Sequence, residues 1–278
     1  MNPQKLEHLE PAASRSGAAP AGTKARPYRL GVVSYLNARP LCEAFEDRPE
    51  ARLEPAVPSA LAPLLREDRC DVALLPVVDY WRERASLQIV SDACIGCDGE
   101  TMTVRVFAKR PADKISLLHV DGDSHTSIIL AQLIWRTLYD RELELAEWRP
   151  DDPATLEEVE AVLLIGDKVV NNAPTGFGFE VDLGAAWKYH TGLPFVFAAW
   201  CGRADRDFER LAVLLAEARD RGQADAERIA REAAPAHGWP EAAAVHYLCS
   251  ALKFTLTDAM RSGMDRFFRL AIEHGLLP

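Results

Sequence analysis

The sequence has no run of about 18 consecutive apolar residues, which is the length that a membrane-crossing helix needs. Its start also lacks the short apolar core of a secretory signal peptide, so we expect a cytoplasmic protein. Basic residues are in deficit: 32 Lys and Arg stand against 42 Asp and Glu, a formal net charge of −10. Nucleic acids and anionic membrane surfaces attract clusters of Lys and Arg, so neither is expected as a partner.

Several motifs of common catalytic and nucleotide-binding sites are also missing. The chain has no phosphate-binding P-loop, no G-x-S-x-G nucleophile elbow and no H-E-x-x-H zinc motif. Gly176 and Gly178 lack the third glycine of a dinucleotide fingerprint and do not open a predicted helix. The seven histidines show no metal-ligand spacing, so no metal site is predicted. His190 is the best single acid or base in the second half, and we interpret it as structural.

Cysteine gives the one pattern that resembles a redox or metal motif. Six cysteines are present, and Cys94 and Cys97 form a C-x-x-C pair. Such a pair is consistent with a redox centre or with half of a zinc site. A zinc site needs a second pair of ligands at a suitable spacing, and none follows. We therefore interpret both as core thiols, with a zinc or redox role as the alternative.

The apolar pattern along the 278 residues predicts an α/β protein. Residues 14–23 are mostly Ala, Gly, Ser and Pro, which cannot form a core, so residues 1–26 are predicted to be a disordered tail. Residues 28–33, 71–76 and 161–166 have the apolar runs of buried strands, and residues 127–138 have a helical apolar face. Strands alternate with helices, which favours mostly parallel sheets.

The order of these segments indicates two lobes with a cleft between them. We assign residues 27–108 and 198–278 to lobe one and residues 109–197 to lobe two, so the chain crosses between lobes twice. A short helix is predicted at 152–159. Further helices are predicted at 205–221, 224–233, 240–252 and 258–274, the last with an apolar stripe typical of a core helix.

Polar residues follow the first strand of each lobe, at the point where a helix begins. These turns read Ser34-Tyr-Leu-Asn37 and Ser124-His-Thr-Ser127. Free backbone N–H groups and the helix dipole make such a turn an anion site, and ligands of open parallel sheets lie beyond the carboxyl ends of the strands. Two facing turns predict a small ligand with carboxylates at both ends. The alternative is that these residues are only N-caps, with Asn37 capping a helix that has Pro40 in its first turn.

Charged residues near the turns add a few candidates. Arg39, His125 and Arg105 are possible cationic donors to a carboxylate, and screening over about 8 Å lets such local donors outweigh the net negative charge. Asp167 directly follows a predicted strand, where site residues occur, although an Asp that starts a turn would look the same. From the residues alone we infer a two-lobed binder of a small carboxylated molecule. Neither the molecule nor a reaction follows from these patterns.

Residues 32–41 read V-V-S-Y-L-N-A-R-P-L and resemble the opening signature of the chorismate dehydratases of menaquinone biosynthesis, in the futalosine pathway. The resemblance continues in order from about residue 28 to 272. It includes D-V-A-L-L-P at 71–76, C-I-G-C-D-G-E at 94–100, S-H-T-S at 124–127, L-I-G-D at 164–167 and most of 182–198.

The resemblance implies a fold and a reaction. The fold is a two-lobed type II periplasmic-binding-protein-like fold with an interlobe cleft. The reaction, that of a hydro-lyase (a carbon-oxygen lyase), removes water from chorismate to give 3-[(1-carboxyvinyl)oxy]benzoate without a metal, nucleotide or redox cofactor. Two alternatives stay open: a non-catalytic cytoplasmic small-carboxylate binding protein, and the related 1,4-dihydroxy-6-naphthoate synthase. The sequence does not indicate an oligomeric state.

The resemblance also implies roles for individual residues. The asparagine of the family's S-Y-L-N motif corresponds to Asn37, and a hydroxyl residue after the D-G loop corresponds to Thr103, or alternatively to Thr101; both matched residues are expected to be catalytic. The family pattern has serine at the Thr103 position and arginine at the His125 position. Substrate binding is expected from Ser34, Tyr35, Arg39, Ser124, His125, Thr126, Ser127 and Asp167.

Overall fold

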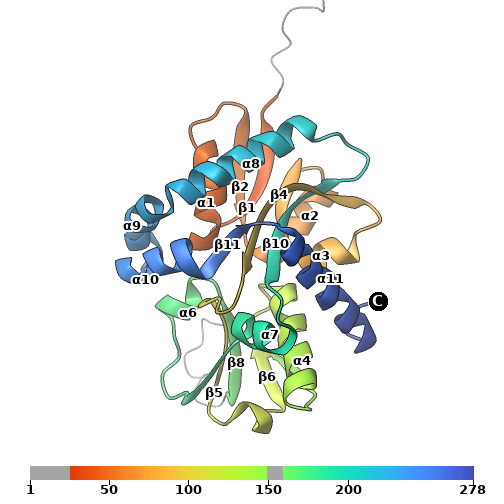
Figure 1. Cartoon of the computed structure of the whole chain (residues 1–278), viewed down its shortest axis with the longest axis vertical. Coiled ribbons are helices and arrows are strands. Elements are labelled where there is room, and N and C mark those ends of the chain that lie inside the picture. The colour runs from red at the N-terminus through yellow and green to blue at the C-terminus, as the bar shows by residue number, and fades with distance from the viewer. Residues whose placement is uncertain (1–25, 149–158) are drawn as a thin grey trace, which may run out of the picture.

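The computed structural model describes residues 26–148 and 159–278. Two β-sheets lie one above the other in two lobes, as Figure 1 shows. The first sheet has the strand order β11-β4-β10-β3-β1-β2 and the second has the order β7-β6-β8-β5-β9. Apart from Arg26 and Val159, the predicted tail at 1–26 and the predicted helix at 152–159 lie outside the described residues.

The first lobe contains the six-stranded sheet, to which the first strand of the chain belongs, and most of the C-terminal helices. Residues 28–33 and 71–76, predicted to be buried strands, form β1 and β3, and Leu30 and Val72 in them are fully buried. The strands are β1 (Tyr28–Val33), β2 (Ala51–Ala56), β3 (Val72–Pro76), β4 (Leu87–Cys97), β10 (Phe195–Arg203) and β11 (Leu252–Thr255). The helices are α1 (Arg39–Cys42), α2 (Leu61–Arg66), α3 (Val77–Arg82), α8 (Glu209–Ala224), α9 (Ala226–His237) and α10 (Glu241–His246).

The second lobe is built around the long helix α4 (His125–Leu138). The predicted apolar face of this helix is confirmed, since Ile129, Leu130, Leu133 and Ile134 are all buried. The strands are β5 (Val104–Ala108), β6 (Leu117–Val120), β7 (Glu144–Glu147), β8 (Ala161–Ile165) and β9 (Phe179–Asp182). The remaining helices are α6 (Lys168–Asn171) and α7 (Leu183–Thr191).

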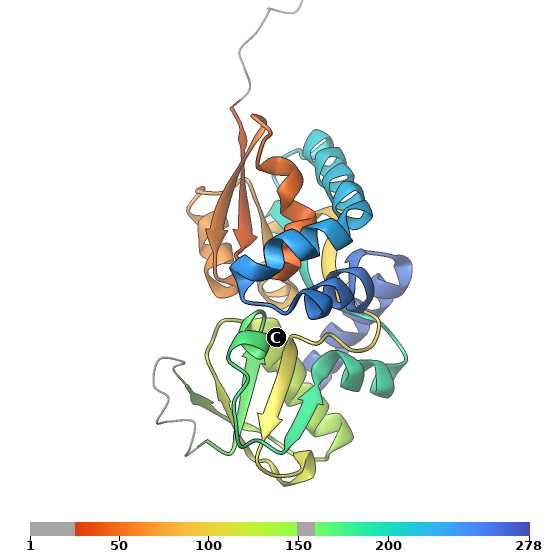
Figure 2. The same cartoon turned by 90° about the vertical axis from the view of Figure 1, so that its left-hand side faces the viewer.

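The last helix, α11 (Asp258–Glu273), lies at the junction of the two lobes (Figure 2). Its predicted apolar stripe is confirmed: Met260, Met264, Phe267 and Phe268 are buried. They share one apolar cluster with residues of α4 and β5 in the second lobe. The same cluster includes Cys97 and Phe195, so α11 packs against the segments in which the chain crosses between the lobes.

The prediction of mostly parallel sheets is wrong. The pairs β1–β2, β1–β3, β6–β7 and β6–β8 are parallel, but β3–β10, β4–β10, β4–β11, β5–β8 and β5–β9 are antiparallel. A parallel pair needs a crossover connection, usually a helix. Strands β5 and β10 instead enter their sheets directly from the other lobe, so they run against their neighbours.

Because of these crossings, the lobe boundaries in the structure lie at other residues than the predicted ones. Strand β5 pairs with β8 and β9, so the boundary predicted after Ala108 comes one strand too late. Strand β10 already begins at Phe195, before the predicted return at 198. Residues 95–100 contain two glycines and predict a turn-rich loop, but residues 95–97 belong to β4, which extends to Cys97. Strands β2, β9 and β11 and helix α7 are short or polar segments that the apolar pattern does not reveal.

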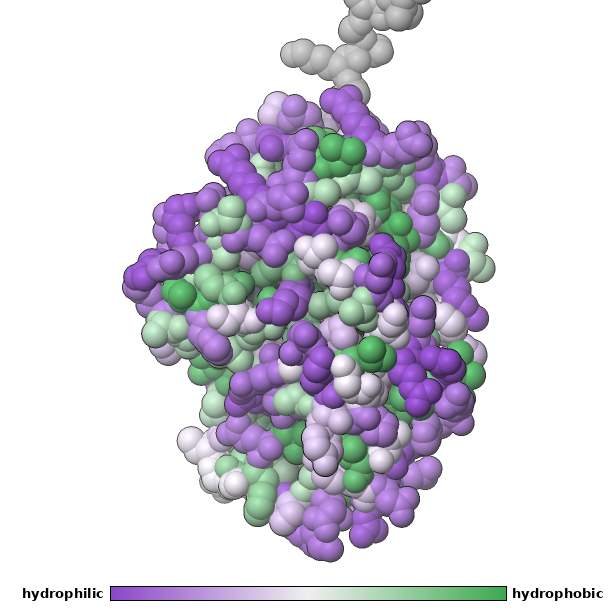
Figure 3. Space-filling view, in the orientation of Figure 1, coloured by the Kyte–Doolittle hydropathy of each residue, from purple (hydrophilic) through white to green (hydrophobic). Residues whose placement is uncertain are grey.

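The described surface has no extended apolar face in the view of Figure 3, where apolar side chains are scattered among polar ones. Among residues 26–148 and 159–278, no helix is long and apolar enough to cross a membrane. Cys94 and Cys97 are fully buried, and burial raises the pKa of each thiol to about 12. A reactive cysteine needs an accessible thiolate, so this environment favours the core interpretation of the C-x-x-C pair.

The carboxylate of Asp71, next to β3, gives the stability of the fold a pH dependence. It accepts hydrogen bonds from the guanidinium of Arg26 at 2.7 and 2.9 Å and from the backbone N–H of Arg29 at 2.8 Å. Burial raises its pKa, but these hydrogen bonds outweigh burial and lower the pKa to about 2. The unfolded value is about 3.9, so this stabilisation is complete above that pH and is lost as the pH falls towards 2.

We therefore expect the destabilisation caused by Asp71→Asn to shrink on acidification. The free energy of unfolding of the variant and of the wild type, measured by urea denaturation from pH 6 to pH 2.5, should converge below about pH 4. A difference that stays constant over this range would contradict the assignment.

Candidate active site

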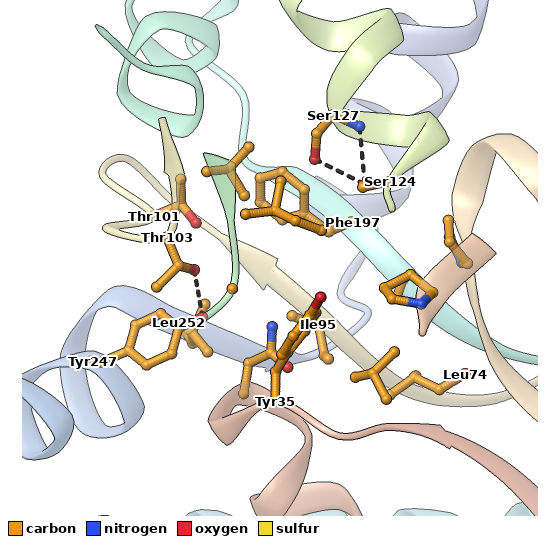
Figure 4. A pocket seen from close by; sticks show the side chains of 18 residues that line it. Tyr35, Leu74, Ile95, Thr101, Thr103, Ser124, Ser127, Phe197, Tyr247 and Leu252 are labelled. Atoms are coloured by element: carbon orange, nitrogen blue, oxygen red, sulfur yellow. Dashed lines mark hydrogen bonds between the residues drawn. The ribbon is translucent and has the colours of Figure 1, made fainter. Parts of the chain in front are cut away.

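A pocket lies between the lobes and receives residues from both (Figure 4). It encloses about 550 Å³, counting its open mouth. Its lining is mostly apolar, and no Asp, Glu, Lys, Arg or His is among the described residues that line it. The lining residues are Val33, Tyr35, Asn37, Pro58, Leu74, Pro76, Ile95, Thr101, Thr103, Val104, Ser124, Ser127, Ile165, Gly166, Phe197, Ala198, Tyr247 and Leu252.

Asn37 lines the pocket from a short 3₁₀ turn, Leu36–Ala38, that follows β1. The prediction that Asn37 caps a helix is wrong, because α1 begins two residues later with Ala38 at its N-cap. The side-chain oxygen Oδ1 of Asn37 is buried and has no hydrogen-bond partner among the residues that the structure describes. An unsatisfied buried acceptor costs about 1–3 kcal/mol, and such groups are characteristic of functional sites. The turn thus presents a free acceptor to a ligand.

Thr103 stands at the entry to β5, where the chain has just crossed into the second lobe. Its hydroxyl is hydrogen-bonded to the phenol of Tyr247, with 2.6 Å between the oxygens. The loop before it is fixed by Asp182, whose carboxylate accepts from the backbone N–H of Thr101 at 3.0 Å and of Met102 at 2.8 Å. Thr101 and Thr103, the two hydroxyl residues that the resemblance marks, both line the pocket. Of these two, Thr103 is the one whose hydroxyl is hydrogen-bonded to Tyr247.

The second predicted turn forms the amino end of α4 and also borders the pocket. Ser124 is the N-cap of α4, and its Oγ accepts from the backbone N–H of Ser127 at 3.3 Å. The two serine hydroxyls lie 2.9 Å apart. In Figure 4 they lie across the pocket from Thr103 and Tyr247. The N-cap interpretation of Ser124 is correct, and the same residue also faces the cavity.

Three predicted polar donors are not in the pocket. Ser34 is exposed and is not part of the lining. The guanidinium of Arg39 is paired with Glu46 at 2.5 Å, and Arg39 is not among the lining residues. Arg105 is paired with Glu180 at 2.9 Å and with Glu100 at 2.5 Å. The cationic donors expected from the sequence are thus engaged in ion pairs elsewhere.

His125 and Thr126 connect the lobes rather than line the pocket. Nδ1 of His125 donates to Oδ1 of Asp79 in α3 at 2.6 Å. The hydroxyl of Thr126 accepts from the backbone N–H of Val78 at 3.2 Å, in a fully buried contact. Helix α4 is thereby fastened to α3 of the first lobe. In this structure the two residues hold the lobes together at one end of the pocket.

Asp167 makes the corresponding contact at the other end. Its carboxylate accepts from Nδ1 of His237 at 2.7 Å, from Nε1 of Trp239 at 3.0 Å and from the backbone N–H of Leu36 at 3.3 Å. All three donors belong to the first lobe, whereas Asp167 follows β8 of the second. Asp167, which was expected to bind substrate, forms an interlobe contact in this structure, next to the turn that carries Asn37.

We expect Asp167→Ala to open the cleft of the ligand-free protein. The change leaves three first-lobe donors without their acceptor, which favours a conformation in which water reaches them. Small-angle X-ray scattering should give a larger radius of gyration for this variant than for the wild type. Asp205→Ala, which breaks only the surface pair with Arg203, is the control. Equal scattering curves for Asp167→Ala and the wild type would contradict this role.

Tyr35 and Gly166 illustrate how closely the lobes approach. The phenol of Tyr35 donates to Asp123 of the second lobe at 3.3 Å. Gly166 has a φ of +61°, and a Cβ at this position would lie 2.8 Å from the ring of Tyr35. A side chain larger than hydrogen is therefore excluded at Gly166, both by its backbone conformation and by the tyrosine ring.

Tyr247 is the functional candidate that the motif analysis does not single out. It is 1% exposed, and it begins a π-helical turn, Tyr247–Ala251, within a segment predicted to be an ordinary helix. An aromatic residue on a helix normally indicates core packing. Burial raises the pKa of its phenol, while hydrogen bonding with Thr103 and Asn37 acts in the opposite direction. Single-turn π segments are frequent at functional sites, but they leave no clear signal in the sequence.

A sequence profile described as menaquinone biosynthesis matches residues 28–273. The chain belongs to the menaquinone biosynthesis family. A chorismate dehydratase from Thermus thermophilus is 28% identical over 264 residues, which cover 87% of this chain and 94% of that protein. The family resemblance inferred from the S-Y-L-N-A-R-P-L segment is confirmed.

Solved structures place this family member in the periplasmic-binding-protein fold. Protein AF1704 from Archaeoglobus fulgidus has a TM-score of 0.72 at 17% identity, covering 91% of this chain and 100% of that one. The alkanesulfonate-binding protein SsuA from Xanthomonas axonopodis pv. citri, solved with bound MOPS, has a TM-score of 0.64 at 12% identity, covering 92% and 96%. The predicted fold class is therefore confirmed for this member of the menaquinone biosynthesis family.

Proposed function

We propose that the protein is a chorismate dehydratase that removes water from chorismate to give 3-[(1-carboxyvinyl)oxy]benzoate in the futalosine pathway. The observation that carries the proposal is the interlobe pocket, which brings Asn37 and Thr103 together. Both residues correspond to positions that the family resemblance marks as catalytic. The likeness to the Thermus thermophilus chorismate dehydratase supports the same substrate.

The composition of the pocket suits this substrate. Apolar side chains such as Val33, Leu74, Ile95 and Phe197 offer a surface to a cyclohexadiene ring and exclude water. A small number of well-placed polar groups is enough to orient a ligand in such a pocket. The amino end of α4, with Ser124 and Ser127, is suited to one substrate carboxylate because its N–H groups and dipole favour an anion.

The reaction breaks a C–O bond and a ring C–H bond and releases one water, and the ring becomes aromatic. Much of the driving force is therefore in the substrate, and the protein has to orient it and stabilise charge. Among the described lining residues the only ionisable side chains are Tyr35 and Tyr247, whose pKa values are raised chiefly by burial. We therefore propose that a carboxylate of chorismate itself accepts the ring proton and passes it to the departing hydroxyl group, so that the two leave together as one water.

In this proposal Asn37 and Thr103 form the hydrogen bonds that orient the substrate and stabilise its departing hydroxyl group. The free Oδ1 of Asn37 accepts a hydrogen bond from the ligand, and the Thr103 hydroxyl donates to the oxygen that leaves. Neutral donors and acceptors are sufficient because hydrogen bonds that already point towards the developing charge are stronger in a site of low dielectric constant than in water.

Two substrates distinguish this proposal from its alternatives. Purified protein is mixed separately with chorismate and with cyclic dehypoxanthine futalosine, without metal or nucleotide. The midpoint temperature of unfolding is then measured with each compound. The products are separated by chromatography, and their masses are determined by mass spectrometry. A dehydratase gives a product lighter than chorismate by one water. A naphthoate synthase converts only the futalosine derivative, and a binding protein shows a thermal shift without a product.

A further inference from the structure

Tyr247 contacts the pocket from the first lobe, whereas Thr103 contacts it from the second. The hydrogen bond of 2.6 Å between them is therefore itself an interlobe contact, buried at both ends. Thr103 is 2% exposed and Tyr247 is 1% exposed. Removing either hydroxyl leaves the other without its partner in a dry environment, which makes the pair sensitive to how the lobes close.

The phenol of Tyr247 is held in place by its surroundings. Its ring stacks on Trp239, with the ring centroids 4.9 Å apart and the planes at 18°. Trp239 in turn donates its indole N–H to Asp167 of the second lobe. The π-helical turn that begins at Tyr247 leads directly into β11 of the first sheet. The ring that carries the hydroxyl is thus held by its stacking on Trp239, and the turn that carries the ring continues into the first sheet.

The Thr103 hydroxyl has more freedom without this partner. A threonine hydroxyl rotates to suit its neighbours, and the side chain itself samples more than one χ1 rotamer. If Tyr247 donates to the oxygen of Thr103, the Thr103 proton is left to point into the pocket. Tyr247 would then select the one orientation in which Thr103 donates to a bound molecule.

We propose that Tyr247 is a positioning residue for the dehydration, which holds the Thr103 hydroxyl towards the departing oxygen once the lobes are closed. This inference rests on the proposed function. Tyr247 acts as a neutral phenol and does not take the ring proton. Its effect falls on the transition state rather than on substrate binding, because a misdirected donor mainly slows the chemical step.

The test compares Tyr247→Phe with the wild type and with Tyr28→Phe, which removes a phenol outside the pocket. Phenylalanine keeps the stacked ring, so Tyr247→Phe should fold and unfold at a temperature within a few degrees of the wild type. We expect kcat for chorismate to fall by about 10- to 100-fold while KM changes by less than about threefold. Tyr28→Phe should keep the wild-type kcat.

A double-mutant cycle separates positioning from a general structural effect. In a Thr103→Val background the hydroxyl that Tyr247 positions is gone, so adding Tyr247→Phe should lower kcat/KM by a smaller factor than in the wild-type protein, and what remains reflects the hydrogen bond of Tyr247 with Asn37. Multiplicative losses in the double variant, or a wild-type kcat in Tyr247→Phe, would overturn the inference alone. A wild-type protein that leaves chorismate unchanged would overturn the proposed function and this inference with it.

Discussion

Replacing Asn37 by alanine is expected to lower the turnover of chorismate by a factor of about 10³, the effect seen when one group that stabilises a transition state is removed. The side-chain oxygen of Asn37 is buried and Asn37 lines the pocket, where we propose that it accepts a hydrogen bond from the ligand. The same change removes an unsatisfied acceptor, so the free energy of unfolding should fall by less than about 1 kcal/mol, or rise. Loss of activity without loss of stability identifies a functional side chain.

The measurement pairs steady-state kinetics with urea denaturation on the same preparations. Asn172→Ala is the matched control, because Asn172 is exposed and lies outside the pocket lining. It should match the wild type in both measurements. A turnover of Asn37→Ala within tenfold of the wild type would show that the reaction does not depend on this turn.

Gly222→Ala is expected to destabilise the protein by about 3 kcal/mol, at the upper end of the usual cost of overpacking. Helix α8 packs against α1 at this glycine, and a Cβ there would lie 1.7 Å from the carbonyl oxygen of Pro40. Alanine is intrinsically better than glycine in a helix by about 1 kcal/mol. A net loss of stability can therefore come only from the steric conflict, which pushes the two helices apart.

This prediction links the fold to the site, since α1 directly follows the turn that carries Asn37. Urea denaturation of Gly222→Ala should show the lost stability, and turnover measured well below the unfolding temperature should also decrease. Gly178→Ala is the control: apart from its chain neighbours, no atom of residues 26–148 or 159–278 lies within 4 Å of its added Cβ, so it should change stability by less than about 0.5 kcal/mol. A Gly222→Ala variant as stable as this control would contradict the packing argument.

The predicted site residues that the structure brings together in the pocket are those set by local patterns. An apolar run followed by a polar turn places Asn37 beyond β1 and Ser124 beyond β6, and both reach the same pocket. Thr103 was identified through the family resemblance, and it too lies there. These positions depend on the end of one strand or on one turn, which neighbouring residues determine.

The predicted site residues that the structure places outside the pocket lining depend on how the lobes meet. His125, Thr126 and Asp167 have the side chains expected of carboxylate-binding turns, yet they bind groups of the opposite lobe. A polar residue at a helix start has the same local sequence whether its partner is a ligand or another lobe. Tyr247 was missed for a related reason, since a buried aromatic residue on a helix looks like core until its hydroxyl partner is known.

The central claim is that chorismate loses water in the pocket that contains Asn37. The most direct test follows chorismate by proton NMR in the presence of purified wild-type protein, without added metal or nucleotide, beside Asn37→Ala. Our account predicts that the ring signals of chorismate are replaced by those of a meta-substituted benzoate with the wild type, and that they persist with the variant. Unchanged chorismate after incubation with folded wild-type protein would contradict it.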